Sequence, residues 1–361
     1  MNDAILKHWQ LRALIIGVIA ALLSIVGAFI NHAQFFQSYL FAWLFWLGLS
    51  LGALVVVMMQ NLTGGWWGLA VRNLCFAAIM TLPLLIVLFV PLLFGLHDIY
   101  PWSNGVVAGV HKREYLNVPF FIARAVFYFA VLIAFAFALR RRFNEYPIAL
   151  SAGGLICYVL CMNFASTDWV MSLDPEWYST VFVIVFMAGQ FLAALSLTTA
   201  LLCAFSDART VPAKAFHDLG NMLLAFVIFW IYVAFSQLLI IWSGNLPKEI
   251  SWYLPRSRGG WQWLALVLVI GEFLLPFFLL LSREAKRTPH RLATICICIL
   301  VINVANDFWL IAPTFHARFS VHWLDLAELL AIGGFWFALF FHLLKQRPLV
   351  ASELMEVKQH G

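Results

Sequence analysis

The chain has 361 residues, of which 64% are hydrophobic and only 11% are charged, and its formal net charge at pH 7 is +5. A soluble domain carries about 25% charged residues, so this composition excludes a soluble protein and indicates an integral membrane protein. The positive charge does not call for a nucleic-acid partner, because it lies mainly in one set of the loops between apolar segments.

Ten apolar segments are long enough to cross a bilayer, for which a helix needs about 20 apolar residues. In chain order they are 11–30, 37–59, 73–95, 118–139, 149–169, 178–205, 216–242, 260–282, 290–311 and 322–344. The first has no small-residue cleavage site and matches the others in length, so we expect an uncleaved helix. The sequence predicts an all-α integral membrane protein, with residues 1–361 forming one polytopic domain.

Lysine and arginine are distributed unequally between the two sides of the predicted bundle. The N-terminal segment, the even-numbered loops and the C-terminal segment carry fifteen of them, and the other loops carry six. Cytoplasmic loops are enriched in these residues. We therefore expect both termini to be cytoplasmic, with the longer loops at 96–117, 170–177, 243–259 and 312–321 facing outward.

The cysteines and histidines do not form a redox-cofactor motif. All six cysteines lie inside predicted spans, and none has the Cys-x-x-Cys spacing of a covalent haem or a typical iron–sulfur site. Most histidines near spans stand at span ends, and His342 is alone on the last helix. A haem held between helices needs two histidines at matching depth. We expect no redox cofactor bound by this chain itself.

Similar segments recur along the chain with an offset of 139 residues. Asp168 closes the fifth span and Asp307 closes the ninth. An even number of spans separates the two copies, so both have the same orientation. The offset predicts two parallel-repeat four-helix bundles, at about 37–169 (helices 2–5) and about 178–311 (helices 6–9), flanked by helices 1 and 10. Small residues such as the Gly48/Gly52 pair predict close helix contacts.

A first group of candidate residues lies at the outer end of the first bundle: His97, Asp98, Arg124 and Asp168. Ionisable groups are costly in a bilayer and tend to mark a substrate or proton path. Quinol oxidation releases two protons, so its site needs a proton acceptor beside an aromatic, apolar slot. These four are quinol-site candidates, and Asp168 is alternatively an outer proton gate. In the structural alternative, Arg124 simply pairs with Asp168, and the other two are solvated.

A second group lies in the second bundle and the last helix: Glu272, Asp307, His322, Asp325 and Glu328. The last three occur at i, i+3 and i+6, which forms a slowly winding stripe on one helix. Glu272 falls near the bilayer midplane, where a bare charge is expensive. We interpret the five as proton-path candidates. The alternative is that they hydrogen-bond to one another and fix helix packing.

Tryptophans cluster at the span ends, which is typical of an aromatic belt at the membrane interface. The loop 243–259 adds Trp252, Tyr253, Arg256 and Arg258. These four residues belong to the belt or form a docking surface for a partner.

Four segments carry a resemblance to a known family: 96–102, 168–179, 244–250 and 322–325. In them the chain resembles the ActF-type subunits of the NrfD/PsrC-like family, the shorter membrane subunits of the alternative complex III. The resemblance implies a subunit of a quinol:cytochrome c or quinol:electron-acceptor oxidoreductase in a bacterial inner membrane. It also implies that the only cofactor here is a quinone, either menaquinone or ubiquinone.

The same resemblance implies partners that hold the missing redox groups. They are a larger NrfD-like sister subunit, a periplasmic iron–sulfur subunit, and multihaem and monohaem cytochrome c subunits, together with lipids. In this family the quinol site is associated more firmly with the sister subunit. For this chain the resemblance therefore implies quinol-site scaffolding, transmembrane proton conduction, or both.

Three other functions stay open at the level of sequence. A quinone-reactive membrane anchor of a polysulfide- or nitrite-type reductase belongs to the same superfamily but usually has fewer spans. A secondary transporter with a carboxylate site is disfavoured by the parallel repeat, and Pro276 is the main candidate for the broken helix that such a protein needs. A purely structural scaffold is the third.

Overall fold

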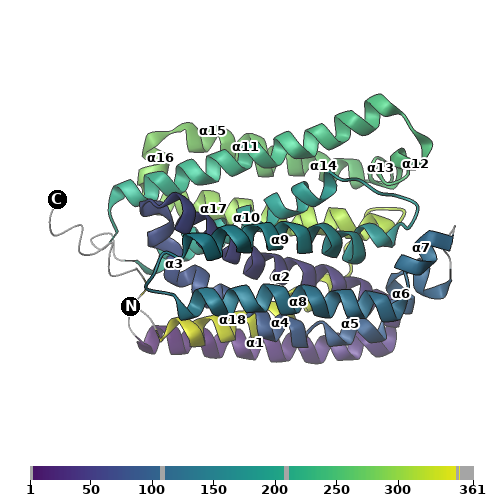
Figure 1. Ribbon diagram of the computed structural model, residues 1–361, viewed down its shortest axis with the longest axis horizontal. Helices are drawn as coiled ribbons and strands as arrows, with labels where there is room; N and C mark the ends of the chain where they lie inside the picture. The colour runs from purple at the N-terminus through teal and green to yellow at the C-terminus, as the bar shows by residue number, and fades with distance from the viewer. Residues whose placement is uncertain (1–2, 106–109, 207–210, 347–348, 350–361) are drawn as a thin grey trace.

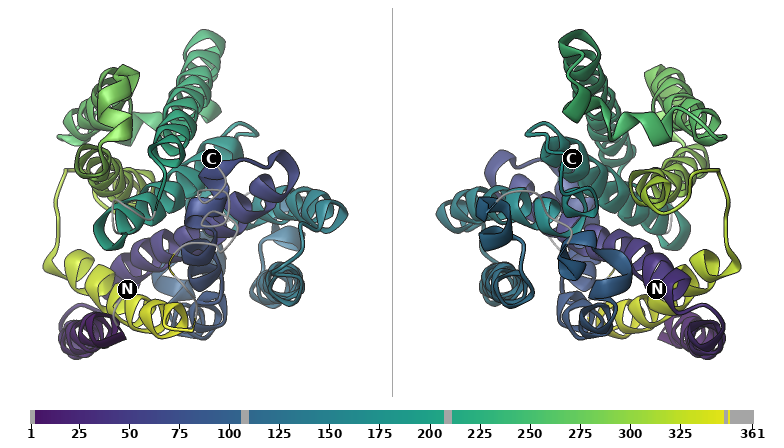
Figure 2. Two further views of the ribbon diagram at one scale, coloured as in Figure 1. Left: turned by 90° about the vertical axis from the view of Figure 1, so that its left-hand side faces the viewer. Right: turned by 90° about the vertical axis from the view of Figure 1, so that its right-hand side faces the viewer.

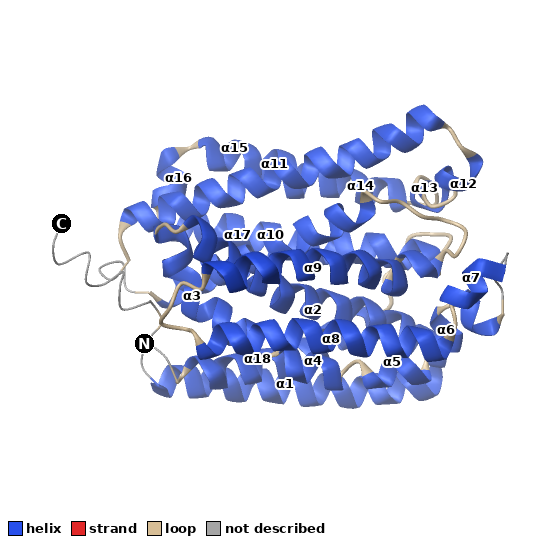
Figure 3. Ribbon diagram, in the orientation of Figure 1, coloured by secondary structure: helices blue, strands red, loops and turns tan. Residues whose placement is uncertain are grey.

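The computed structural model describes residues 3–105, 110–206, 211–346 and 349, and this part of the chain is helical with no strand (Figure 3). Ten helical segments within it are long and apolar enough to span a membrane, as the sequence predicts. They are Asp3–Ile30 (α1), His32–Thr63 (α2), Trp66–Phe94 (α3–α5), Val118–Arg141 (α8), Ile148–Leu173 (α9 and η2), Phe182–Phe205 (α10), Ala213–Gly244 (α11), Trp261–Leu281 (α14, η3 and α15), Pro289–Thr314 (α17 and η4) and Trp323–Leu344 (α18). The chain is an all-α, multi-pass membrane protein.

Short helices connect the spans or divide them. The third span consists of α3 (Trp66–Ile79), α4 (Leu82–Val87) and α5 (Val90–Phe94), because Pro83 and Pro91 each open a new helix. The connecting helices are α6 (Leu96–Ile99), η1 (Pro101–Asn104), α7 (Val110–Tyr115), α12 (Pro247–Ile250), α13 (Tyr253–Arg256) and α16 (Arg283–Arg287). No connection in the described ranges is long enough to form a second domain.

The helices pack into two rings with the same cyclic order, which is consistent with the predicted repeat. In the first bundle, α2 contacts α3 and α9, and α8 contacts α4 and α9. In the second, α10 contacts α11 and α17, α15 contacts α11, and α14 contacts α17. The two bundles meet where α2 packs against α10, and α1 lies along α18 at the edge of the molecule (Figure 2).

The contact between the bundles depends on a glycine. A Cβ atom added to Gly52 of α2 would lie 2.0 Å from the carbonyl oxygen of Gln190 of α10. The small-residue pattern therefore correctly predicts a close helix contact. α2 is apolar on all sides and its most apolar stretch is wholly buried, so it forms the centre of the fold.

The two ends of the molecule differ. At the end where α1 begins, the Lys345 ammonium donates a hydrogen bond to the Gln10 side chain, so the start of α1 and the end of α18 are neighbours. We call this end the termini side. The opposite end, the loop side, carries α6, α7, α12 and α13 (Figure 1). Because the number of spans is even, α1 begins and α18 ends on the same side of the membrane. The lysine and arginine bias predicts that the loop side faces outward.

Candidate functional site

Glu272 lies in the middle of the eighth span and is completely buried, with 0% of its surface exposed. The side-chain amide of Asn303 on α17 donates a hydrogen bond of 3.0 Å to its Oε1 atom. Its Oε2 atom is buried without a hydrogen-bond partner among the described residues. Within the same residues, no basic side chain lies at salt-bridge distance from this carboxyl group.

A change of helix type determines the position of Glu272. Residues Val269–Leu274 (η3) form a π-helical stretch between α14 (Trp261–Leu268) and α15 (Leu275–Leu281). Pro276 has no N–H to donate to the carbonyl of residue 272, and its ring crowds that carbonyl. A π-helical turn absorbs this mismatch, and such turns are frequent at functional sites. The span therefore changes from α-helical to π-helical hydrogen bonding around Glu272 and remains a continuous helix.

Asp307 continues the polar surface toward the loop side. It follows Asn303 by four residues on α17, so the two share a helix face and lie about 6 Å apart along the axis. Asp307 is 9% exposed, and its side chain makes no hydrogen bond or ion pair within the part of the chain that the structure describes. Asp307, Asn303 and Glu272 thus form a polar series from near the loop side to the middle of the second bundle.

The other predicted proton-path residues form a separate group. His322, Asp325 and Glu328 lie on α18, which packs against α1 and α2. His322 and Asp325 form a capping box, in which the His322 backbone N–H donates to Asp325 at 2.8 Å. The Ser38 hydroxyl of α2 donates to the same carboxylate at 2.5 Å. These bonds fit the packing alternative for His322 and Asp325.

Glu328 lies one turn further along α18 and is 1% exposed. Its Oε1 atom has no hydrogen-bond partner among the described residues. The five predicted residues therefore do not form one continuous series. They include two separate buried carboxyl sites, one around Glu272 and one at Glu328.

Asp168 is held by a complete set of hydrogen bonds. The Arg124 guanidinium donates to both of its oxygens, from Nε at 2.9 Å and from Nη2 at 2.8 Å, and the Tyr128 hydroxyl donates at 2.8 Å. Arg124 also lies over the ring of Tyr115, 3.8 Å from its centroid, and donates to the Tyr115 carbonyl. Both charged side chains are buried. This geometry favours the structural alternative, a lock between α8 and the end of α9.

The structure does not bring His97 and Asp98 into that ion pair. The exposed His97 ring hydrogen-bonds to Asn104 at 3.0 Å, and Asp98 pairs with His32 at 3.0 Å. Both bonds lie near the surface of the loop side. The four quinol-site candidates are thus one exposed residue, His97, one partly buried residue, Asp98, and one buried ion pair.

Sequence reasoning missed two residues that complete these sites. Tyr128 follows Arg124 by four residues, and Asn303 precedes Asp307 by four, so helical spacing was the available signal. Arg256, for which the sequence left the interface belt and a docking surface open, is only 2% exposed. Its burial, and that of Trp252, rules out the docking-surface alternative for these two side chains.

Comparisons with known proteins do not identify the chain: no protein-family model matches it, and no curated protein matches it either. No group of three histidine, cysteine, aspartate or glutamate residues within the described ranges is arranged to hold a metal ion.

Proposed function

We propose that this chain conducts protons through its second bundle as a membrane subunit of a quinol-oxidising respiratory complex. The observation that carries the proposal is the Glu272 carboxyl group, which is buried at mid-span with one oxygen unpaired and no cation beside it. A structural carboxylate in a bilayer is normally paired, as Asp168 is with Arg124. Glu272 has no such partner.

The arrangement suits a group that exchanges a proton. An isolated carboxylate is very costly in an apolar interior, so the resting group is the neutral acid. The Asn303 amide holds Oε1, which leaves Oε2 as the oxygen that carries the proton. Asp307 is the next carboxyl group toward the loop side. No hydrogen bond joins the two carboxyl groups in the described residues, so the proposal requires a water molecule to enter between them during proton transfer.

The assignment to a respiratory complex is supported by the four segments that resemble the ActF-type subunits of the alternative complex III. On this proposal the chain lies in a bacterial inner membrane and contacts a larger sister subunit. Iron–sulfur and haem groups belong to partner subunits, and a quinone is the redox compound that reaches this chain. Quinol oxidation releases protons, and a conducting bundle beside it supplies or removes them.

One observation favours a second candidate, a secondary transporter. Transporters form their substrate and ion sites at discontinuous helices near mid-span, and Glu272 lies in a π-helical stretch near mid-span. The stretch stays helical between α14 and α15, however, and exposes no broken helix ends. For this reason we place it second.

Two measurements test the proposal. Purification from the native membrane should bring down c-type haem and iron–sulfur subunits, seen in the absorption spectrum; a haem-free chain that takes up a solute into vesicles would support the transporter instead. In the purified assembly, Glu272→Gln should slow quinol-driven proton transfer by on the order of 10²-fold, the usual contribution of a positioned proton donor. Glu328→Gln is the matched control, and equal effects of both changes would contradict the assignment.

A further inference from the structure

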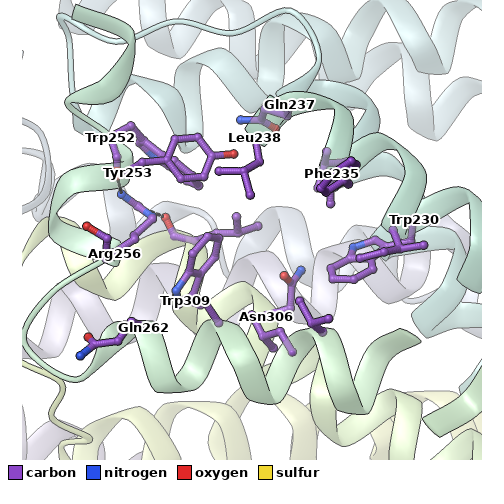
Figure 4. A pocket seen from close by; sticks show the side chains of 18 residues that line it. Trp230, Phe235, Gln237, Leu238, Trp252, Tyr253, Arg256, Gln262, Asn306 and Trp309 are labelled. Carbon is purple, nitrogen blue, oxygen red and sulfur yellow. Dashed lines mark hydrogen bonds between the residues drawn. The ribbon is translucent and has the colours of Figure 1, made fainter. Parts of the chain in front are cut away.

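A cavity of about 290 Å³ lies in the second bundle, toward the loop side. Side chains from α10, α11, α13, α14 and α17 line it (Figure 4). Most are apolar or aromatic, and Trp252 and Trp309 meet edge to face with ring centroids 5.5 Å apart. None of the predicted site residues lines this cavity.

The wall contains four hydrogen-bond donors without acceptors. They are Trp230 Nε1, Gln237 Nε2, Arg256 Nε and Trp309 Nε1, and each atom is buried with no partner among the residues that the structure describes. The side chains of Trp230, Gln237 and Arg256 are only 2–3% exposed. Buried polar groups in proteins are nearly always hydrogen-bonded, so four unpaired donors around one cavity indicate a ligand with acceptor atoms.

Arg256 is fixed in place with one guanidinium nitrogen, Nε, left without a partner among the described residues. Its Nη atoms donate to the carbonyl oxygens of Trp252 at 2.7 Å and Leu310 at 2.6 Å, and the guanidinium lies 3.6 Å from the centroid of the Trp252 ring. Burial lowers the pKa of Arg256 to about 9. No carboxylate forms a salt bridge with it in the described ranges. A preorganised, uncompensated cation of this kind favours an electron-rich oxygen as its partner.

The cavity opens sideways between two membrane-spanning segments. Phe235 and Leu238 of α11 and Val269 of η3 line it, and they are 57%, 45% and 39% exposed. These residues lie within spans, where the exposed surface faces lipid. The occupant therefore enters from the bilayer and is itself soluble in lipid.

We propose that this cavity binds the ring of a lipid-soluble quinone, with the ring carbonyl oxygens accepting hydrogen bonds from the unpaired donors. Arg256 and Trp309 lie at one end of the cavity and Trp230 at the other (Figure 4), which suits a ring with carbonyls on opposite sides. The volume of about 290 Å³ is just below the range of about 300–1,000 Å³ for ligand sites, so the cavity takes the ring and leaves an isoprenoid tail in the bilayer. The choice of a quinone among lipid-soluble carbonyl compounds rests on the proposed function.

The site shares helix α17 with the proposed proton path. Asn306 lines the cavity, whereas Asp307, the next residue of α17, does not line it. The cavity and the carboxyl series therefore lie on different faces of the same helix.

Photoaffinity labelling tests the assignment in the full assembly purified from its membrane. An azido-substituted decyl benzoquinone should label peptides of α11, α13 or α14, and decylubiquinone should displace the label. Decanol, which shares the tail without the ring, should not displace it. Displacement by decanol or by phosphatidylglycerol as effective as displacement by decylubiquinone would show an acyl-chain or lipid site and overturn the assignment.

Two conservative variants test the donors. Trp230→Phe and Trp309→Phe each remove one N–H with little change of shape and should weaken decylubiquinone competition roughly three- to tenfold, the worth of one hydrogen bond. Trp263→Phe is the matched control, because Trp263 is 66% exposed on α14 and does not line the cavity. Unchanged competition in the double variant Trp230→Phe/Trp309→Phe would overturn the proposal.

The outcomes separate this inference from the proposed function. If labelling is absent while Glu272→Gln still slows proton transfer, only the quinone assignment fails. If labelling depends on Trp230 and Trp309 while Glu272→Gln has no effect, only the proton path fails.

Discussion

The change Asp168→Asn should destabilise the protein without removing proton transfer. Asp168 is 1% exposed and accepts two hydrogen bonds from Arg124 and one from Tyr128. Asparagine has nearly the same shape but carries no charge, and its NH₂ group faces a donor. The change therefore leaves the buried Arg124 guanidinium without its counter-ion.

Removing one partner of a buried ion pair costs about 3–5 kcal/mol, mainly because the remaining charge stays buried. Replacing both partners by apolar residues of similar volume is often close to neutral. We therefore expect Asp168→Asn to lower the free energy of unfolding by about 3–5 kcal/mol. The double variant Arg124→Met/Asp168→Leu should lose clearly less than the single variant.

Unfolding in mixed detergent micelles, followed by circular dichroism, measures these free energies. Asp174→Asn is the matched control, since Asp174 is only partly buried and accepts weaker hydrogen bonds of 3.3 and 3.5 Å. We expect this control to cost less than about 1 kcal/mol. A stable Asp168→Asn variant that has lost proton transfer would refute the structural role and make Asp168 the proton gate.

Three further changes probe packing and the proton path. Gly52→Ala places a Cβ 2.0 Å from a carbonyl oxygen of α10 and should cost about 1–3 kcal/mol by overpacking, whereas Gly153→Ala, which meets no atom within 4 Å, should be neutral or stabilising in the same unfolding assay. Ser38→Ala removes a donor to the capping carboxylate of α18 and should cost about 1–3 kcal/mol, again read from unfolding, and an unchanged midpoint would contradict that role. Asn303→Leu removes the hydrogen bond that holds Glu272, so proton transfer should fall roughly tenfold in a quinol-driven pH assay, and full activity would remove Asn303 from the path.

Much of the fold follows from hydropathy. All ten spans are predicted because each is a long apolar run, and the Gly48/Gly52 pair correctly marks a close helix contact. Hydropathy does not say which helices are neighbours. The predicted proton series divides because α18 packs on α1 and α2, which separates Asp325 and Glu328 from Glu272.

A contact between two candidate residues was predictable only where both residues lie on spans of the same predicted bundle. The pairing of Arg124 with Asp168 was one of two alternatives, and the buried ion pair between them favours the structural role. The cavity in the second bundle was missed for a different reason. A tryptophan and an arginine in a loop are typical of an interface belt. The Arg256 side chain is instead buried because it donates hydrogen bonds to the carbonyl oxygens of Trp252 and Leu310. Backbone carbonyls are present at every residue, so the sequence does not show which of them will bind an arginine.

The central claim is that Glu272 is a neutral acid within the membrane and exchanges its proton during turnover. Infrared difference spectroscopy of the purified assembly, before and after addition of quinol, measures this most directly through the C=O stretch of protonated carboxylic acids. We predict a carboxylic-acid band that shifts in D₂O, disappears in Glu272→Gln and persists in Glu328→Gln. A difference spectrum that Glu272→Gln leaves unchanged would contradict the account.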